Sequence, residues 1–70
     1  MKTMTIDKIE ATQKSEFSSE IVQRLYELGL RPGLQIKIIR RISFGTVTII
    51  EYGHTRLALN ELEMSCLHGH

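Results

Sequence analysis

Three residues that could bind a metal ion lie close together near the end of the 70-residue sequence: Cys66, His68 and His70. In an extended strand, residues at i, i+2 and i+4 point to the same side, so these three side chains would share one face. A thiolate with two imidazoles favours late ions such as zinc or Fe(II) over magnesium. The spacing therefore predicts a candidate transition-metal site, with His54 as a weaker fourth ligand and a solvated tail as the alternative.

Residues suited to catalysis are scarce. Glu61 and Glu63 are close in sequence, but a helical spacing of two points their side chains apart, and capping and solvation explain them. The glycines are single, and no Gly-x-x-x-x-Gly-Lys motif is present to bind a phosphate. We therefore expect a protein that is not an enzyme.

Basic residues and one aromatic residue are the candidates for binding a partner. Arg40 and Arg41 are adjacent, so on a strand they point to opposite faces and do not form one dense basic patch. Phe44 lies in a short loop, where its ring either anchors an interface or plugs the end of a barrel. We predict a partner-binding surface made of Phe44, Arg41 and Arg31.

Composition and charge argue against several classes of function. Hydrophobic residues make up 41% and charged residues 24% of the chain, as in globular domains and unlike disordered chains. The net charge of +1 gives no strong field that would attract nucleic acid. No apolar run approaches the roughly 20 residues that span a bilayer, and no signal peptide is recognisable. We expect one cytoplasmic domain over residues 1–70, with no nucleic-acid partner and no insertion into a membrane.

A helix is predicted over residues 17–30. Ser18 is the expected N-cap, with Ser19 as its rival, because a serine hydroxyl can accept a hydrogen bond from the first turn. Phe17 and Val22 have the spacing of a hydrophobic staple. The helix start is therefore expected at Ser18.

The end of this helix is predicted at Gly29. A glycine readily takes the left-handed conformation that terminates helices, and Leu25 and Leu30 occupy the two positions whose contact accompanies a Schellman motif. Leu25 and Leu28 belong to an apolar stripe that packs on the core. The termination signal is therefore local.

Turn residues punctuate the rest of the chain. Pro32 and Gly33 meet the requirements of a type II turn, and Gly53-His54 has the form of a type II′ hairpin turn. Asn60 and Glu63 have the spacing of a capping box, which predicts one turn of helix. These turns separate short segments that can pair as neighbours in a sheet.

Five strands are predicted from segments rich in branched residues. They cover residues 4–9, 35–42, 46–52, 56–59 and 65–68. In the first, Met4 and Ile6 share a face, and strict alternation places Ile9 on the other. Short strands in so small a chain bury one face best by curling. The sequence therefore predicts a mainly β fold, a small and partly open barrel with the helix inserted between strands 1 and 2.

The string from Arg24 to Gly33 resembles the Arg-Leu-x-x-Leu-Gly-Leu-x-Pro-Gly signature of the ferrous iron transport protein A family, FeoA. The likeness extends over about two thirds of the chain, from Ile21 to Leu67. The matching positions of the motif are Leu25, Leu28, Gly29, Leu30, Pro32 and Gly33. Further matches are Ile36, Ile38, Arg40, Phe44, Gly45, residues 56–59, Met64 and Leu67.

This resemblance implies an SH3-like barrel and a cytosolic adaptor that supports ferrous iron uptake by binding the membrane transporter FeoB. The main alternative is a regulatory module that binds or senses Fe(II) or zinc through Cys66, His68 and His70. A nucleic-acid-binding barrel ranks third, because the near-neutral charge disfavours it. The sequence leaves open whether the chain forms a homo-oligomer.

Overall fold

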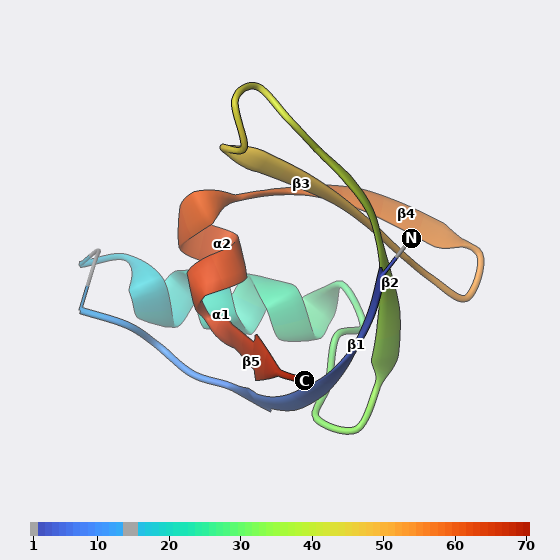
Figure 1. The fold of residues 1–70 in the computed structure, drawn as a ribbon. Coiled ribbons are helices and arrows are strands. Elements are labelled where there is room, and N and C mark those ends of the chain that lie inside the picture. Colours follow the sequence, from blue (N-terminus) through green and yellow to red (C-terminus); the bar gives the residue numbers. More distant parts are fainter. Residues whose placement is uncertain (1, 14–15) are drawn as a thin grey trace.

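The branched segments form a five-stranded antiparallel sheet in the computed structural model, which describes residues 2–13 and 16–70. In chain order the elements are β1 (Lys2–Ile9), α1 (Ser18–Glu27), β2 (Gln35–Ile42), β3 (Val47–Tyr52), β4 (Thr55–Asn60), α2 (Glu61–Ser65) and β5 (Leu67–Gly69). The strand order is β4-β3-β2-β1-β5, and the sheet bends around the two helices as a half-barrel (Figure 1). The predicted mainly β, partly open barrel, with a helix between strands 1 and 2, is confirmed.

The core lies between the inner face of the bent sheet and the helices. Two alternate residues of β3 are buried there, since Thr48 is 5% and Ile50 is 0% exposed. The buried apolar residues are Ile6, Ile9, Leu25, Leu30, Ile36, Ile50, Leu59, Cys66 and Leu67. Neither α1 nor α2, the helices of the described residues, is long and apolar enough to span a bilayer.

The start of α1 differs from the prediction. The N-cap residue is Phe17, which makes no side-chain cap bond, and its ring is 58% exposed. Ser18 is already helical and buried, and its hydroxyl donates a hydrogen bond to the Thr12 carbonyl oxygen at 2.7 Å. The Ser18 cap was therefore wrong, because a carbonyl six residues away takes the hydroxyl. The staple was wrong too, since Phe17 stands one position too late for it.

The end of α1 is the predicted Schellman motif. Gly29 has a φ of +97°, and its N–H donates to the Tyr26 carbonyl oxygen at 3.0 Å. The Leu30 N–H reaches back to the Leu25 carbonyl oxygen at 3.1 Å, and both leucines are fully buried. These two bonds satisfy carbonyls that a helix end leaves free.

The predicted turns lead into and through the sheet. Gly33 has a φ of +91°, and the Leu34 N–H donates to the Arg31 carbonyl oxygen at 3.1 Å, as in a type II turn. Between β3 and β4, Gly53 has a φ of +56° and the φ of His54 is not positive, as in a type II′ turn. Both turn predictions are confirmed.

A shift of register in β1 corrects the prediction for Ile9. Ile6 pairs with Gly69 and Ile9 with Leu67, and the register shifts between Ile6 and Lys8. An extra residue in a strand returns the following side chains to the face that they would otherwise leave. Ile6 and Ile9 are therefore both buried, although strict alternation would place them on opposite faces.

The pairing of β5 with β1 depends on a glycine that the sequence did not single out. A side chain at Gly69 would overlap the backbone carbonyl oxygen of Thr5. The two strands also exchange hydrogen bonds between Thr5 and His70, at 2.8 and 3.2 Å. Gly69 therefore lets the chain end lie against the edge of β1.

Candidate functional site

The three predicted metal ligands do not share a face. Cys66 is the C-cap of α2 and its N–H donates to the Glu63 carbonyl oxygen at 3.2 Å, so β5 begins only after it. Its thiol is fully buried, whereas His68 and His70 are exposed. The extended geometry on which the metal prediction depended is therefore wrong for Cys66.

The histidines of this segment have separate surroundings. His68 pairs with Lys8 in the sheet, and the Nδ1 atom of His70 lies 3.1 Å from the Asp7 carboxylate. His54 stands in the turn between β3 and β4. Within residues 2–13 and 16–70, no three His, Cys, Asp or Glu side chains are grouped closely enough to hold a metal ion.

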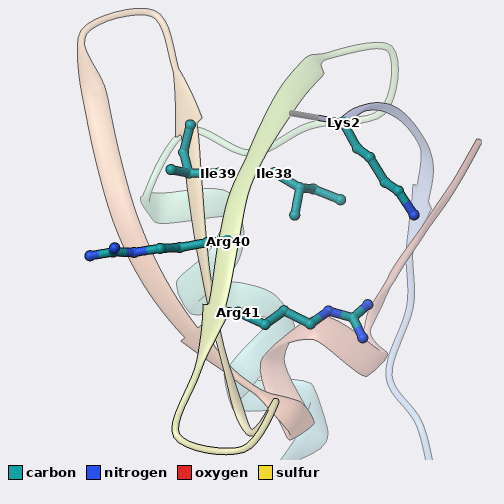
Figure 2. A pocket seen from close by; sticks show the side chains of 5 residues that line it. All are labelled: Lys2, Ile38, Ile39, Arg40 and Arg41. Carbon is teal, nitrogen blue, oxygen red and sulfur yellow. The ribbon is translucent and has the colours of Figure 1, made fainter.

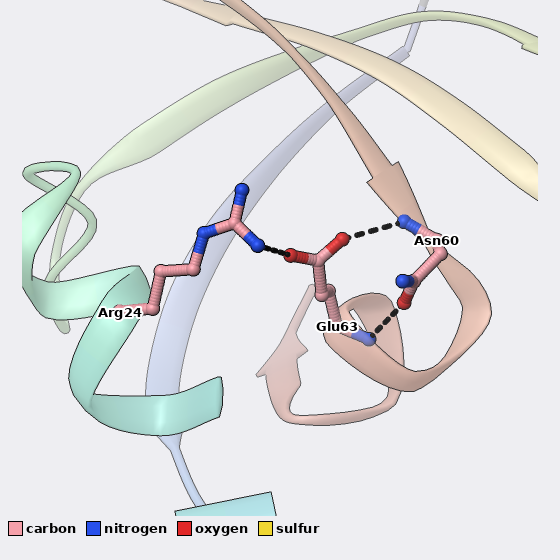
Figure 3. A network of polar contacts seen from close by, with 3 residues as sticks. All are labelled: Arg24, Asn60 and Glu63. Atoms are coloured by element: carbon pink, nitrogen blue, oxygen red, sulfur yellow. Dashed lines mark hydrogen bonds and ion pairs between the residues drawn. The ribbon is translucent and has the colours of Figure 1, made fainter. Parts of the chain in front are cut away.

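Both oxygens of the Glu63 carboxylate make structural contacts. One accepts the Asn60 N–H at 2.9 Å, while the Asn60 side chain accepts the Glu63 N–H at 2.8 Å, which completes the predicted capping box. The other lies 3.3 Å from the Arg24 guanidinium of α1 (Figure 3). Glu63 is 6% exposed, so this carboxylate ties α2 to α1.

Phe44 lies at the tip of the hairpin between β2 and β3, and its side chain is fully exposed. Ser43 and Phe44 have φ values of 54° and 58°, which residues other than glycine adopt at a cost of about 1 kcal/mol or more each. The ring therefore does not plug the barrel. An exposed aromatic residue on a strained loop is typical of an interface rather than of a core.

Hydrogen bonds hold this loop in one shape. The Gly45 N–H donates to the Ile42 carbonyl oxygen at 3.1 Å. The Ser43 carbonyl oxygen accepts two bonds from Thr46, from its N–H at 3.1 Å and from its hydroxyl at 2.7 Å. The loop therefore presents the Phe44 ring without a large loss of backbone freedom on binding.

Arg41 and Arg40 point to opposite sides of β2, as predicted (Figure 2). Arg41 pairs with Thr48, whose side chain is buried in the concave face, so Arg41 lies on that side. It lines an opening of about 460 Å³ between the hairpin and α2. The other lining residues are Gly45, Thr48, Glu61, Met64 and Ser65.

Arg31 is far from this hairpin. It belongs to the type II turn before β2, whereas Phe44 follows the last residue of that strand. An eight-residue strand spans roughly 26 Å at about 3.3 Å per residue. The structure therefore places Arg41 next to the Phe44 loop and leaves Arg31 at the opposite end of β2.

Several cations on or beside the sheet have no acidic partner among the described residues. Lys2, Arg31, Arg40 and Arg41 make no ion pair within residues 2–13 and 16–70. By contrast, Arg56 of β4 lies 2.8 Å from the Glu51 carboxylate of β3, and this bond lowers the pKa of Glu51 below its ordinary value. Unpaired positive charge therefore gathers on β2 and at the start of β1, apart from Arg31 in the turn.

Comparisons with known proteins identify this architecture. The FeoA domain family model matches residues 1–68. A crystal structure of FeoA from Stenotrophomonas maltophilia in complex with zinc has a TM-score of 0.77 at 20% identity, over 97% of this chain and 78% of that one. That protein is described as an SH3 domain protein and a possible ferrous iron transport activating factor.

A second solved structure has the same fold. It is the solution NMR structure of a Pseudomonas aeruginosa protein, with a TM-score of 0.69 at 23% identity, over 99% of this chain and 87% of that one. No curated protein matches the sequence. The match to the family model covers nearly the whole chain, and both solved structures share its SH3-like architecture.

Proposed function

Because the chain belongs to the FeoA domain family, we propose that it is a non-catalytic, cytosolic adaptor of ferrous iron uptake that binds an FeoB-type membrane transporter. The family and the description of the Stenotrophomonas protein as a possible transport activating factor support a role in iron transport. Both oxygens of the Glu63 carboxylate are engaged in structural contacts, which supports a structural rather than a catalytic role for this residue.

The observation that carries the proposal is the exposed ring of Phe44. Aromatic and arginine side chains contribute much of the energy of protein interfaces, and truncation at a central one costs about 2 kcal/mol or more. Phe44 is fully exposed on a hydrogen-bonded loop, and Arg41 at the base of the hairpin makes no ion pair with the residues that the structure describes. We assign these two residues to the main contact, and Arg31 to a separate and weaker one.

A pull-down tests this assignment. The chain serves as bait for cytosol and detergent-solubilised membranes, in the parent form and as Phe44→Ala and Phe17→Ala. Phe17 is the matched control because it is the other exposed phenylalanine and lies at the start of α1. We expect Phe44→Ala to lose the transporter and Phe17→Ala to retain it.

The same variants need a measurement of stability. The Phe44 ring has no buried contacts to lose, so the melting temperature of Phe44→Ala should stay within a few degrees of the parent. Retention of the transporter by a folded Phe44→Ala chain would refute the contact. Retention by Arg41→Ala with the same yield as the parent would remove Arg41 from it.

A further inference from the structure

The two neighbours of β2 cover different lengths of it. β1 pairs with β2 from Thr5 opposite Gln35 to Lys2 opposite Ile38, whereas β3 continues to pair with β2 as far as Ile42. Over residues 39–42, the described part of the chain therefore borders β2 on one side only. The register of β2 against β3 shifts between Ile38 and Arg40, and from Arg40 onward the backbone N–H and C=O groups point alternately to the two sides of the strand. Those on the β1 side have no partner strand among the described residues.

A pocket lies along this open edge. It measures about 410 Å³ and is lined by Lys2, Ile38, Ile39, Arg40 and Arg41 (Figure 2). The lining holds three cations and two isoleucines and no carboxylate. None of the three cations makes an ion pair within the described residues, as shown above. The edge therefore combines free backbone hydrogen-bonding groups with uncompensated positive charge.

The charge also limits what can lie on this edge. A second copy of the chain pairing edge to edge would bring Arg40 and Arg41 against the same arginines of its partner, and like charges opposite each other in a sheet are destabilising. A strand that carries carboxylates is instead attracted by Arg40 and Arg41. Charge complementarity thus selects an acidic occupant over a second copy.

We propose that the edge of β2 over residues 39–42 binds an extended acidic segment of a partner protein by strand addition. The incoming segment pairs with β2 and continues the line of β1 beyond Lys2. Main-chain hydrogen bonds supply the attraction common to such complexes, and the side chains supply the selectivity. This inference does not depend on the transporter being the partner.

The alternation of β2 specifies the recognised pattern. A residue opposite another in a sheet projects to the same face as its partner. Arg40 and Arg41 project to opposite faces, so two consecutive acidic residues in the incoming strand place one carboxylate beside each arginine (Figure 2). Lys2 lies on the same side as Arg41 and adds to the attraction there. The pattern is therefore an adjacent pair of acidic residues between strand-forming neighbours.

Nuclear magnetic resonance on the full chain labelled with ¹⁵N tests the proposal with synthetic hexapeptides. The probe is acetyl-Thr-Val-Glu-Glu-Val-Thr-amide. One control replaces both glutamates by lysine, and a second keeps them but is N-methylated at alternate residues, which removes backbone donors and leaves the charge. We expect saturable shifts of the amides of Lys2 and residues 39–42 with the probe, and none with either control.

Protein variants separate the edge from charge alone. Arg40→Gln combined with Arg41→Gln should lower the affinity for the probe peptide roughly tenfold or more. The matched control removes two cations elsewhere on the same strands, by Lys37→Gln with Lys8→Gln, and should change its affinity by less than about twofold. The amide spectrum of each free variant shows that it is folded.

Three results would overturn the inference. One is the lack of saturable binding by the probe. Another is equal binding of the N-methylated peptide, which would reduce the effect to ionic attraction. The third is concentration-dependent broadening of the residue 39–42 amides in the free protein, which would show that a second copy occupies the edge. None of these measurements involves the transporter, so the adaptor proposal fails or holds separately.

Discussion

The two ends of β2 use the left-handed backbone for different purposes. Before the strand, Gly29 and Gly33 take positive φ values, and backbone hydrogen bonds close the helix end and the turn that they form. After the strand, Ser43 and Phe44 take positive φ values with side chains in place, and the Phe44 ring is fully exposed. Before the strand only glycines take this conformation, whereas the hairpin loop combines Gly45, at a φ of +85°, with two strained residues that carry side chains. This contrast supports the proposal that the hairpin end contacts the partner.

A tyrosine strengthens the end before β2. The Tyr52 hydroxyl donates a hydrogen bond to the Leu28 carbonyl oxygen at 2.5 Å, at the C-terminus of α1. A Cβ atom at position 29 would lie 3.7 Å from the Tyr52 ring. β3 is thus joined to the helix end, and burial raises the pKa of Tyr52. The hairpin end has no comparable bond from a side chain to another element among the described residues.

The largest loss of stability is expected from Gly29→Val. A branched side chain in the left-handed region is strained by about 2 to 3 kcal/mol, whereas its Cβ atom would meet the Tyr52 ring at an ordinary contact distance. A domain of this size has roughly 3 to 5 kcal/mol of net stability, so the variant should be largely unfolded on warming. Thermal melts by circular dichroism measure this.

The control at the same position is Gly29→Asn. Asparagine tolerates the left-handed conformation better than other side chains, so its melting temperature should fall much less. Equal midpoints for the valine variant and the parent would show that the end of α1 does not require this conformation, and would remove the contrast between the two ends of β2.

The next effect is expected from Glu63→Ala. It removes the carboxylate that accepts the Asn60 N–H and lies beside Arg24, while the Asn60 side chain can still accept the N–H of residue 63; losing hydrogen bonds to a charged group costs about 1 to 2 kcal/mol. Glu61→Ala on the exposed side of α2 is the matched control and should change stability by less than about 0.5 kcal/mol. Urea denaturation gives both values. Equal losses would mean that Glu63 does not tie the helices together.

A smaller effect is expected from Tyr52→Phe, which should cost about 1 kcal/mol by removing one hydrogen bond. The raised pKa of Tyr52 means that folding favours the neutral phenol. Its contribution is therefore present in full below its ordinary value of 10.0 and is lost as pH rises through the raised value. The difference in denaturation midpoint between parent and variant should shrink in that alkaline range. A difference in midpoint that does not change with pH would contradict the coupling between the ionisation of Tyr52 and folding.

The smallest effect should have the opposite sign. Phe44→Asn places a residue suited to positive φ at the hairpin tip and loses no buried contact, so it should stabilise the domain by up to about 1 kcal/mol. The same variant should lose the transporter. A decrease in stability would mean that the Phe44 ring contributes to the fold, which would weaken the contrast between the two ends of β2.

Signals that act over a few residues allowed correct predictions. Leu25, Gly29 and Leu30 define a helix end from their spacing alone, and Asn60 with Glu63 define a cap in the same way. The bonds that these residues make lie within one or two turns of chain. The end of α1, the turns and the hairpins could therefore be predicted before the structure.

The wrong predictions came from contacts that the sequence patterns did not include, some within a few residues and some between distant strands. Ser18 donates to Thr12 instead of capping α1, and a register shift in β1 buries Ile9. Cys66 continues a helical turn, which removes it from the face of the two histidines. The open edge of β2 could not be predicted either, because it depends on where β1 stops pairing. The register shift and the open edge depend on how distant strands pair, which no local pattern encodes.

The pairing of the first strand with the last also sets an order in time. Ile6 pairs with Gly69, so during synthesis β1 leaves the ribosome long before β5 exists. At about 5 to 20 residues per second the outer edge of β1 waits on the order of seconds without its neighbour. Asp7 and Lys8 are exposed on that strand, and charges on an open strand discourage pairing with other chains. These two residues can thus protect the nascent chain from aggregation until β5 pairs with β1.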